Sequence, residues 1–443
     1  MNIREEAAKM KLAAPAMAAS TIEERNAALR GIAVSLEAHR EEVFAANALD
    51  MKAAEEAGVS PAIRKRLKYD TVKMRDSIAG LYELEKLEDP VGRILLSREL
   101  DEGLILKRIS VPIGVIGVIF EARPDAMVQV ASLCLKSGNC AILKGGKETA
   151  NTNRVLFRLI SDAAKAAGLP SSCLLQAELH NEIDELLSCD QDVDLLIPRG
   201  SNSFVRYIME HTKIPVMGHS SGICHVYADE DIDEEQAIPI IVDSKIQYAA
   251  ACNAAETLLV HRGIAEAFLP KAAAALAGAG VKLRGSKEAA DILSRAYAEG
   301  RIGENALIAA EDLMEGEDFR TEYNDFVMSI ALVDDVIEAV EHINKYGSRH
   351  TDTILTTNDL AAVYFRAMVD SAGVYRNCST RFADGFRYGF GAEVGISTGK
   401  LHARGPVGLD GLVTYKYVME GQGHIVADYA SGKRQFHHRD LEF

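Results

Sequence analysis

Residues 113–120 read IGVIGVIF, an eight-residue run with no polar side chain. Such a run is typical of a strand that is buried on both faces of a parallel sheet. Further short strand-like segments follow at 140–143, 193–197 and 223–227, and stretches with helical spacing separate them. This alternation predicts a doubly wound α/β domain, in which ligands bind beyond the carboxyl ends of the strands.

A second set of alternating elements follows the acidic segment DEDID at 229–233. We expect a helix over 234–248, followed by strands at 257–260, 326–333, 351–355 and 373–376. The predicted fold class is therefore α/β, with two doubly wound domains.

The segment before these domains has a helical pattern. Residues 2–85 are rich in Ala, Glu, Lys and Arg at helical spacing, which predicts a leader of three or four helices. Ser20 and Glu23 have the spacing of a capping box. Ser60-Pro61 can start a further helix, as its N-cap and first-turn proline.

A β-hairpin is predicted between the leader and the first α/β set. Two apolar-rich runs, 94–100 and 104–109, flank the turn Asp101-Glu102-Gly103. A long hairpin of this kind has exposed edges, which another subunit often covers.

Composition and charge exclude several classes of protein. The chain has 443 residues and a formal net charge of −16. An acidic chain suits neither nucleic-acid binding nor polybasic membrane binding. The most apolar stretch, 111–120, has half the ~20 residues that a spanning helix needs. Early acidic residues argue against a signal peptide, and we expect no contact with a membrane.

The seven cysteines are odd in number and contain no Cys-x-x-Cys pair. This pattern fits neither a disulfide framework nor a zinc ribbon. We therefore expect reduced thiols in a cytoplasmic protein, without a bound metal.

Cys252 stands out from the other cysteines by its surroundings. It lies in AAACNAA at 249–255, where small neighbours leave the sulfur accessible. A thiolate there could attack an activated acyl group and form a thioester. The alternative is a buried apolar cysteine, and position alone favours that alternative.

Two further segments could bind anions. The turn at 143–149 contains Lys144, Gly145 and Lys147, which could hold a phosphate or form a solvated turn. It matches neither a Walker A loop nor the dinucleotide G-x-G-x-x-G pattern. Arg123 follows the first strand, where it could meet an anion or form a structural salt bridge.

The order of these segments resembles the aldehyde dehydrogenase superfamily. Residues 112–120 resemble the strand that leads to the catalytic Asn loop of that superfamily, and 142–144 resemble its cofactor-binding strand and lysine. Residues 322–330 (EYNDFVMSI) resemble its motif for the nicotinamide ribose, centred here on Glu322. Cys252 falls where the superfamily has its nucleophile.

The similarity is closer to the γ-glutamyl phosphate reductase branch of proline biosynthesis. The motifs that carry it are FEARPD, PVMGH, ACNAAET and STGKLHARGP, at residues 120–125, 215–219, 251–257 and 397–406. The resemblance covers most of the chain and implies four regions. They are a cofactor-binding domain (1–93 with 113–231), an oligomerisation element (94–112 with 412–430), a catalytic domain (232–390) and a return segment (391–411).

The resemblance implies NADPH-dependent reduction of L-glutamate 5-phosphate to L-glutamate 5-semialdehyde through a Cys252 thioester. The implied cofactor-binding residues are Lys144, Gly145, Lys147, Gly200, Ser201 and Glu322. Lys147 stands where NAD-preferring relatives commonly have a glutamate, so a 2′-phosphate is favoured. Arg123, Arg381 and Arg387 would meet the substrate. A homo-oligomer and a transient contact with glutamate 5-kinase are implied as partners.

Two departures from the oxidising aldehyde dehydrogenases affect the mechanism. The carboxylate that activates hydrolytic water is missing near Met217, which suits a reductase. Ala122 stands where those enzymes have an oxyanion-stabilising Asn, so another donor is needed, such as backbone N–H groups near Cys252 or the Asn253 side chain.

His219 is the candidate to accept the thiol proton, although it could instead hydrogen-bond to a backbone carbonyl. Two other functions stay open: a hydrolytic NAD(P)-dependent aldehyde dehydrogenase, or a catalytically silent oligomeric binding protein.

Overall fold

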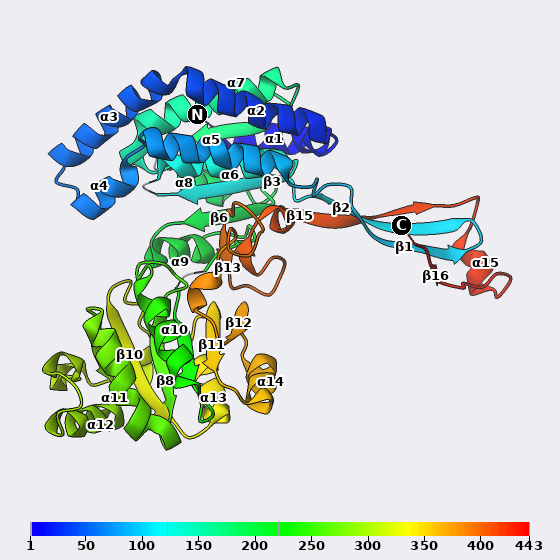
Figure 1. Ribbon diagram of the computed structural model, residues 1–443. Helices are drawn as coiled ribbons and strands as arrows, with labels where there is room; N and C mark the ends of the chain where they lie inside the picture. Colours follow the sequence, from blue (N-terminus) through cyan, green and yellow to red (C-terminus); the bar gives the residue numbers. More distant parts are fainter. Residues whose placement is uncertain (1, 122, 180, 220, 443) are drawn as a thin grey trace. The chain divides into compact units, whose positions relative to one another are not determined.

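The computed structural model describes residues 2–121, 123–179, 181–219 and 221–442. The chain divides into two compact units (Figure 1). Unit 1 comprises Met1–Gly218, Phe390–Gly395 and Val407–Phe443, and unit 2 comprises His219–Gly389 and Ile396–Pro406. Within the described ranges, no helix combines the length and the apolar composition needed to cross a bilayer.

Unit 1 is built on a four-stranded parallel sheet with the order β5-β4-β3-β6. All six residues of β3 are buried, as the apolar run at its centre predicts. The strands are β3 (Val115–Phe120), β4 (Cys140–Lys144), β5 (Leu174–Ala177) and β6 (Leu195–Arg199). The connecting helices are α6 (Pro124–Lys136), α7 (Ala150–Ala166), α8 (Asn181–Leu187) and α9 (Asn202–Glu210).

The leader of unit 1 contains five helices, one more than the upper number expected. They are α1 (Ile3–Ala18), α2 (Ile22–Ala38), α3 (Arg40–Glu56), α4 (Pro61–Leu67) and α5 (Thr71–Lys86). Helix α2 packs against α5 and α7 (Figure 1). Thr21 and Glu24 form the capping box of α2, one residue later than predicted. Ser60 caps α4, and a proline occupies its first turn, as predicted.

The predicted hairpin is present in a second sheet of unit 1, with the order β15-β2-β1-β16. Its strands are β1 (Ile94–Asp101), β2 (Leu104–Pro112), β15 (Val413–Glu420) and β16 (Arg439–Asp440), and α15 (Val426–Ala430) lies between the last two in sequence. Gly103 closes the hairpin turn at φ +74°, a conformation that favours glycine. In Figure 1, β15 lies along β2 of the same chain, with Val413 opposite Pro112. The two segments assigned to one oligomerisation element thus pair with each other within the chain.

Unit 2 contains a six-stranded parallel sheet with the order β12-β11-β7-β8-β10-β9. The strands are β7 (Cys224–Ala228), β8 (Ala255–His261), β9 (Lys282–Gly285), β10 (Val327–Val333), β11 (Thr351–Leu355) and β12 (Gly373–Arg376). The helices are α10 (Glu234–Ile246), α11 (Arg262–Gly278), α12 (Lys287–Ala298), α13 (Val336–Tyr346) and α14 (Asp359–Met368). A separate pair of short strands, β13 (Gly395–Ser397) and β14 (Gly405–Val407), follows.

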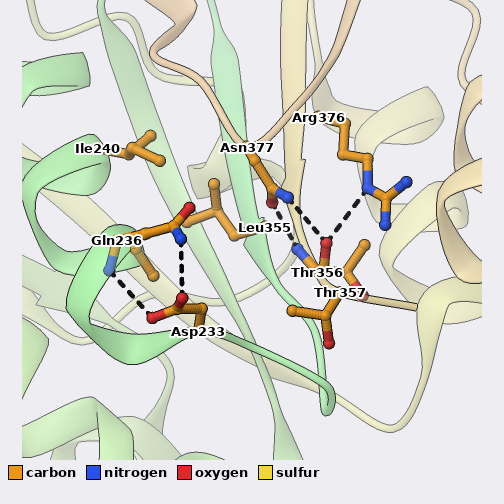
Figure 2. Close-up of a pocket in the computed structure, with 9 residues that line it drawn as sticks. Asp233, Gln236, Ile240, Leu355, Thr356, Thr357, Arg376 and Asn377 are labelled. Atoms are coloured by element: carbon orange, nitrogen blue, oxygen red, sulfur yellow. Dashed lines mark hydrogen bonds between the residues drawn. The ribbon is translucent and has the colours of Figure 1, made fainter. Parts of the chain in front are cut away.

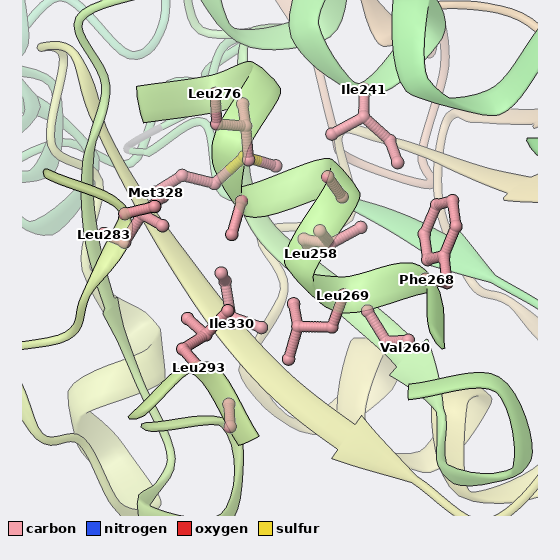
Figure 3. Close-up of a cluster of buried hydrophobic side chains, with 14 of the residues drawn as sticks. Ile241, Leu258, Val260, Phe268, Leu269, Leu276, Leu283, Leu293, Met328 and Ile330 are labelled. Carbon is pink, nitrogen blue, oxygen red and sulfur yellow. The ribbon is translucent and has the colours of Figure 1, made fainter. Parts of the chain in front are cut away.

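The main core of unit 2 lies between its sheet and the helices that follow β7, β8 and β9. Leu258 of β8, Ile330 of β10 and Leu269 of α11 are buried at its centre, as Figure 3 shows. Close packing of these side chains holds β8 in place, and β8 begins three residues after Cys252.

The structure corrects the predicted domain boundaries. Strand β7 pairs with β8 and β11, so residues 219–231 belong to unit 2 rather than to the first domain. The return segment 391–411 is split between the two units. Strands β5 and β9 were not predicted.

We expect Leu258→Ala to lower the free energy of unfolding by about 2–5 kcal/mol, because it leaves a cavity in a closely packed core. Leu360→Ala is the matched control, since Leu360 is 81% exposed on α14. It should change the free energy by less than about 0.5 kcal/mol. Urea unfolding of both variants measures the difference, and equal midpoints would contradict this account of the core.

We expect the outer strand β15 to form a subunit interface, because no strand among the described residues pairs with its second edge and two of its aromatic rings are exposed. Tyr415 and Tyr417 are 51% and 59% exposed. Replacing both with lysine should shift the protein toward monomers in light scattering. Tyr297→Lys changes a 45% exposed tyrosine on α12 and should leave the mass unchanged. A monomeric unmodified protein would refute the interface.

Candidate active site

Cys252 lies in the loop between α10 and β8. Its side chain is half-buried, whereas five of the other six cysteines are buried. The backbone of this loop packs against Gly222, where a Cβ atom would come within 2.1 Å of the carbonyl oxygen of Cys252. Only glycine fits so close to another backbone, so Gly222 fixes the position of the Cys252 loop. The sequence analysis did not identify Gly222.

His350 is the side chain in direct contact with the thiol of Cys252. Its Nε2 atom lies 3.2 Å from Sγ of Cys252, and its Nδ1 atom lies 2.9 Å from Oγ1 of Thr351. If Nδ1–H donates to the threonine hydroxyl, the lone pair is on Nε2 and can accept the thiol proton. The sequence analysis missed His350. The available signal was its position directly before the predicted strand 351–355.

His219, which was predicted to activate the thiol, is hydrogen-bonded elsewhere. Its Nδ1 atom lies 2.9 Å from the carbonyl oxygen of Ile396, which is the alternative considered from the sequence. Its ring meets the ring of His350 edge-on, with the centroids 5.2 Å apart. His219 is therefore part of the same cluster as Cys252, and its role as activator stays a prediction.

Asn253 connects the Cys252 loop to the loop that carries two predicted substrate residues. Its Nδ2 atom donates a 2.7 Å hydrogen bond to the carbonyl oxygen of Ala383, and its side chain is buried. One amide hydrogen is thus used to position the loop. Its predicted role as oxyanion donor stays a prediction, and Ala122 lies outside the described residues.

Arg381 and Arg387 lie together in this second loop. Nε of Arg381 donates to Oε1 of Gln247 at 2.9 Å, and Arg387 donates to the carbonyl oxygen of Arg381 at 2.6 Å. Burial, followed by the charge of Arg387, lowers the pKa of Arg381, and the charge of Cys252 acts in the opposite direction. A cationic side chain thus lies close to the nucleophile, which suits an anionic substrate.

The cluster forms at the amino edge of the unit 2 sheet. The residues that precede β7, β8, β10 and β11 include His219, Cys252, Glu322 and His350, respectively. Parallel strands bring their amino ends to one edge, so segments far apart in sequence converge there. This placement differs from the general expectation of ligands at carboxyl ends.

A buried ion pair lies beside the cluster. Nζ of Lys245 is 2.5 Å from Oε2 of Glu256, and both side chains are buried. Burial raises the pKa of Glu256 to about 7, although the Lys245 ammonium lowers it, and the charge of Glu322 adds to the increase. Glu322 therefore lies near Glu256. Glu256 was not predicted from the sequence to be part of the site.

In unit 1 the predicted cofactor residues lie at the carboxyl edge of the sheet. Lys144 ends β4, and Lys147 is exposed in the short 3₁₀ helix Lys147–Thr149. A Cβ atom at Gly145 would come within 2.2 Å of Nδ2 of Asn153, so a larger residue would displace the Asn153 side chain. Nζ of Lys144 donates to the carbonyl oxygen of Gly145 at 2.7 Å, and burial lowers the pKa of Lys144.

Gly200 and Ser201 follow β6 at the same edge. The backbone N–H of Ser201 donates to Oε2 of Glu121 at 3.2 Å, and a Cβ atom at Gly200 would meet the same oxygen at 2.7 Å. Strand order reverses between β3 and β6, the point at which doubly wound sheets bind ligands. Arg123, at the start of α6, is exposed near the end of β3, and its contact with substrate stays a prediction.

A pocket of about 280 Å³ lies at the opposite, carboxyl edge of the unit 2 sheet. Figure 2 shows Asn377 and Arg376 both donating to the backbone carbonyl of Thr356, and Gln236 donating to Asp233. These polar groups are bonded to one another. The pocket is therefore separate from the cysteine cluster, and we assign it no role in the reaction.

The fold and this site together define an α/β enzyme whose candidate site contains a half-buried cysteine in contact with a histidine. A family model described as the aldehyde dehydrogenase family matches residues 1–292, and the chain belongs to this family. Within it, the chain is 50% identical over 441 residues to gamma-glutamyl phosphate reductase of Acetivibrio thermocellus, covering 100% of this chain and 99% of that protein. It is 51% identical to the same enzyme of Pelotomaculum thermopropionicum, covering 100% and 98%. These relatives place it in the gamma-glutamyl phosphate reductase branch.

Solved structures agree with this placement. The crystal structure of gamma-glutamyl phosphate reductase from Thermotoga maritima has a TM-score of 0.90 and 36% identity, covering 96% of this chain and 100% of that chain. A glyceraldehyde-3-phosphate dehydrogenase from Methanocaldococcus jannaschii, complexed with NADP, shares the fold at 17% identity and a TM-score of 0.61, covering 95% and 93%. The predicted fold class is confirmed.

We expect His350→Asn to slow alkylation of Cys252 by iodoacetamide about tenfold at pH 7, because a cysteine without a proton acceptor is only a few per cent thiolate there. His219→Asn should slow it less than about threefold, since His350 still contacts the sulfur. Mass spectrometry of the Cys252 peptide over time measures both rates. A larger effect of His219→Asn would restore His219 as the activator.

Proposed function

We propose that this chain reduces L-glutamate 5-phosphate to L-glutamate 5-semialdehyde and inorganic phosphate in proline biosynthesis. The observation that carries the proposal is the 3.2 Å contact between Cys252 and His350, in a chain about half identical over its full length to gamma-glutamyl phosphate reductases. The contact supports Cys252 as the nucleophile, and the relatives support the choice of substrate.

In the first step, Nε2 of His350 accepts the proton from the thiol of Cys252. The thiolate attacks the C5 carbonyl carbon, the C–S bond forms and the C–O bond to the phosphate breaks. The positive charge of Arg381 lies beside Cys252, and Arg387 adds a second positive charge. These charges favour binding of the phosphorylated carboxyl group. His350 can return its proton as the thioester is reduced.

The same residues favour reduction over hydrolysis of the thioester. Met217 stands where hydrolytic relatives have a water-activating carboxylate, and its side chain is buried. Without that base, the thioester lasts until it is reduced. The structure therefore supports an acyl-phosphate reductase rather than a hydrolytic aldehyde dehydrogenase.

The carboxyl edge of the unit 1 sheet has donors that suit a dinucleotide. Gly145 and Gly200 add no side chain to these two loops, and Lys144, Lys147 and Ser201 supply cationic and polar groups. A bound nicotinamide cofactor supplies the hydride that converts the thioester to an aldehyde. Because Lys147 is exposed and cationic, the proposal includes a preference for NADPH, with Glu322 contacting the ribose near the nicotinamide.

The proposal also includes a homo-oligomer formed through β15. Transient contact with glutamate 5-kinase would shorten the path of the labile acyl phosphate.

We expect the protein to reduce NADP⁺ with glutamate semialdehyde only when inorganic phosphate is present, because phosphate must release the acyl group from Cys252. Cys252→Ser should lower kcat more than about a thousandfold, since a serine hydroxyl is a far weaker nucleophile. Cys378→Ser, at the other half-buried cysteine, is the control and should keep most activity. Phosphate-independent turnover would identify a hydrolytic enzyme instead.

We expect Lys147→Glu to shift cofactor preference from NADPH toward NADH at least tenfold. A carboxylate would repel the 2′-phosphate, and charged hydrogen bonds of this kind contribute roughly 1.5–3 kcal/mol. Lys165→Glu, at an exposed lysine on α7, makes the same charge change elsewhere in unit 1. The ratio of kcat/KM values for the two cofactors measures the shift. An unchanged ratio would show that Lys147 does not contact the 2′-phosphate.

A further inference from the structure

Cys252, His219 and His350 bring three potential metal ligands to one place. One ligand atom from each residue lies within 4.8 Å of the other two. These are a thiol and two imidazoles, the donor types that zinc prefers. We propose that this cluster binds one Zn²⁺ ion, which reversibly inhibits the enzyme.

The distances fit a tetrahedral ion with little rearrangement. Zn–S bonds of about 2.3 Å and Zn–N bonds of about 2.0–2.1 Å separate the ligand atoms by roughly 3.3–3.6 Å. Sγ of Cys252 and Nε2 of His350 are already 3.2 Å apart, and no pair in the cluster exceeds 4.8 Å. Rotation of the His219 side chain that moves its ligand nitrogen by about an ångström would bring all three ligand atoms to tetrahedral spacing.

Both imidazoles are held by hydrogen bonds at Nδ1. Nδ1 of His219 lies 2.9 Å from the carbonyl oxygen of Ile396, and Nδ1 of His350 lies 2.9 Å from Oγ1 of Thr351. A ring that donates through Nδ1 presents the Nε2 lone pair, and such outer hydrogen bonds are the usual support of zinc-bound histidines.

Binding would remove the groups that the proposed reaction needs. The thiol of Cys252 loses its proton to solvent as the Zn–S bond forms, and the lone pair of His350 becomes a Zn–N bond. Three protein ligands leave the fourth position to water, which a chelator can displace. The ion therefore blocks nucleophilic attack without altering the protein covalently.

Arg381 sets a limit on affinity. Its positive charge acts on Cys252 and opposes a dication at the same place. We therefore expect a dissociation constant of roughly 1 µM, weaker than that of structural zinc sites.

The test is direct metal binding to the full-length protein. Zn²⁺ affinity is measured by competition with a chromogenic chelator, and Co²⁺ serves as a spectroscopic probe of thiolate ligation and tetrahedral geometry. We expect one ion per chain, a thiolate-to-cobalt absorption band, and at least tenfold weaker Zn²⁺ binding in Cys252→Ser, His219→Asn and His350→Asn. Cys378→Ser and His211→Asn, at a half-buried cysteine and an exposed histidine, should bind as the unmodified protein does.

A second preparation guards against variants that fail to fold. Unmodified protein alkylated at Cys252 by iodoacetamide keeps its sequence and should lose the cobalt band. Stoichiometric metal binding that survives this alkylation would overturn the proposal. Weaker Zn²⁺ binding in Cys252→Ser, with unchanged binding in His219→Asn and His350→Asn, would also overturn it. Absence of binding at 100-fold the expected dissociation constant would also overturn it.

The binding measurements do not depend on turnover. A protein that binds Zn²⁺ as described but reduces no acyl phosphate would contradict the proposed function and leave the metal site intact. An active enzyme without a cobalt band would contradict the metal site and leave the proposed function intact. In the active enzyme, inhibition by Zn²⁺ should be fully reversed by EDTA.

Discussion

The candidate site of unit 2 depends on one constraint, the parallel pairing of β11, β7 and β8. Parallel strands place their amino ends at one edge, so the segments before them converge. His350 and Cys252 are 98 residues apart in the chain, yet their side chains are 3.2 Å apart. The buried core behind β8 holds that edge in register, and Gly222 lets the loop before β7 approach the backbone of Cys252. Packing and strand order thus set the distance between the Cys252 thiol and the His350 imidazole.

Local patterns in the sequence predicted most single elements. The run at 113–120 became β3, the turn at 101–103 became a hairpin, and Ser60 caps α4. These signals work because each depends on neighbours within a few residues. The capping box moved by one residue because the sequence offers two adjacent hydroxyl residues, and backbone geometry selects Thr21.

Features that depend on distant contacts were not accessible in the same way. Nothing local distinguishes β7 from the strands of unit 1, and only its pairing with β8 and β11 assigns it to unit 2. For the same reason Cys252 was found by its surroundings and the resemblance, whereas its partner His350 was not. Lys144 and Gly145 were placed correctly at a strand end, because a glycine turn after a strand is a local signal. The contacts of Arg381 could not be read from sequence, because they come from Gln247, which is 134 residues away.

The buried pair of Lys245 and Glu256 couples proton uptake to the folded state. Burial raises the pKa of Glu256 from its ordinary value of 4.5 to about 7, so folded chains hold a proton that unfolded chains release between these values. Unfolding in that window therefore liberates a proton, and the free energy of unfolding falls as the pH rises, by up to about 1.4 kcal/mol per pH unit. The loss ends above the raised pKa, where the carboxylate is ionised in both states. The contribution of Glu256 to the free energy of unfolding is thus greatest in mildly acidic solution. A paired surface carboxylate usually has the opposite effect.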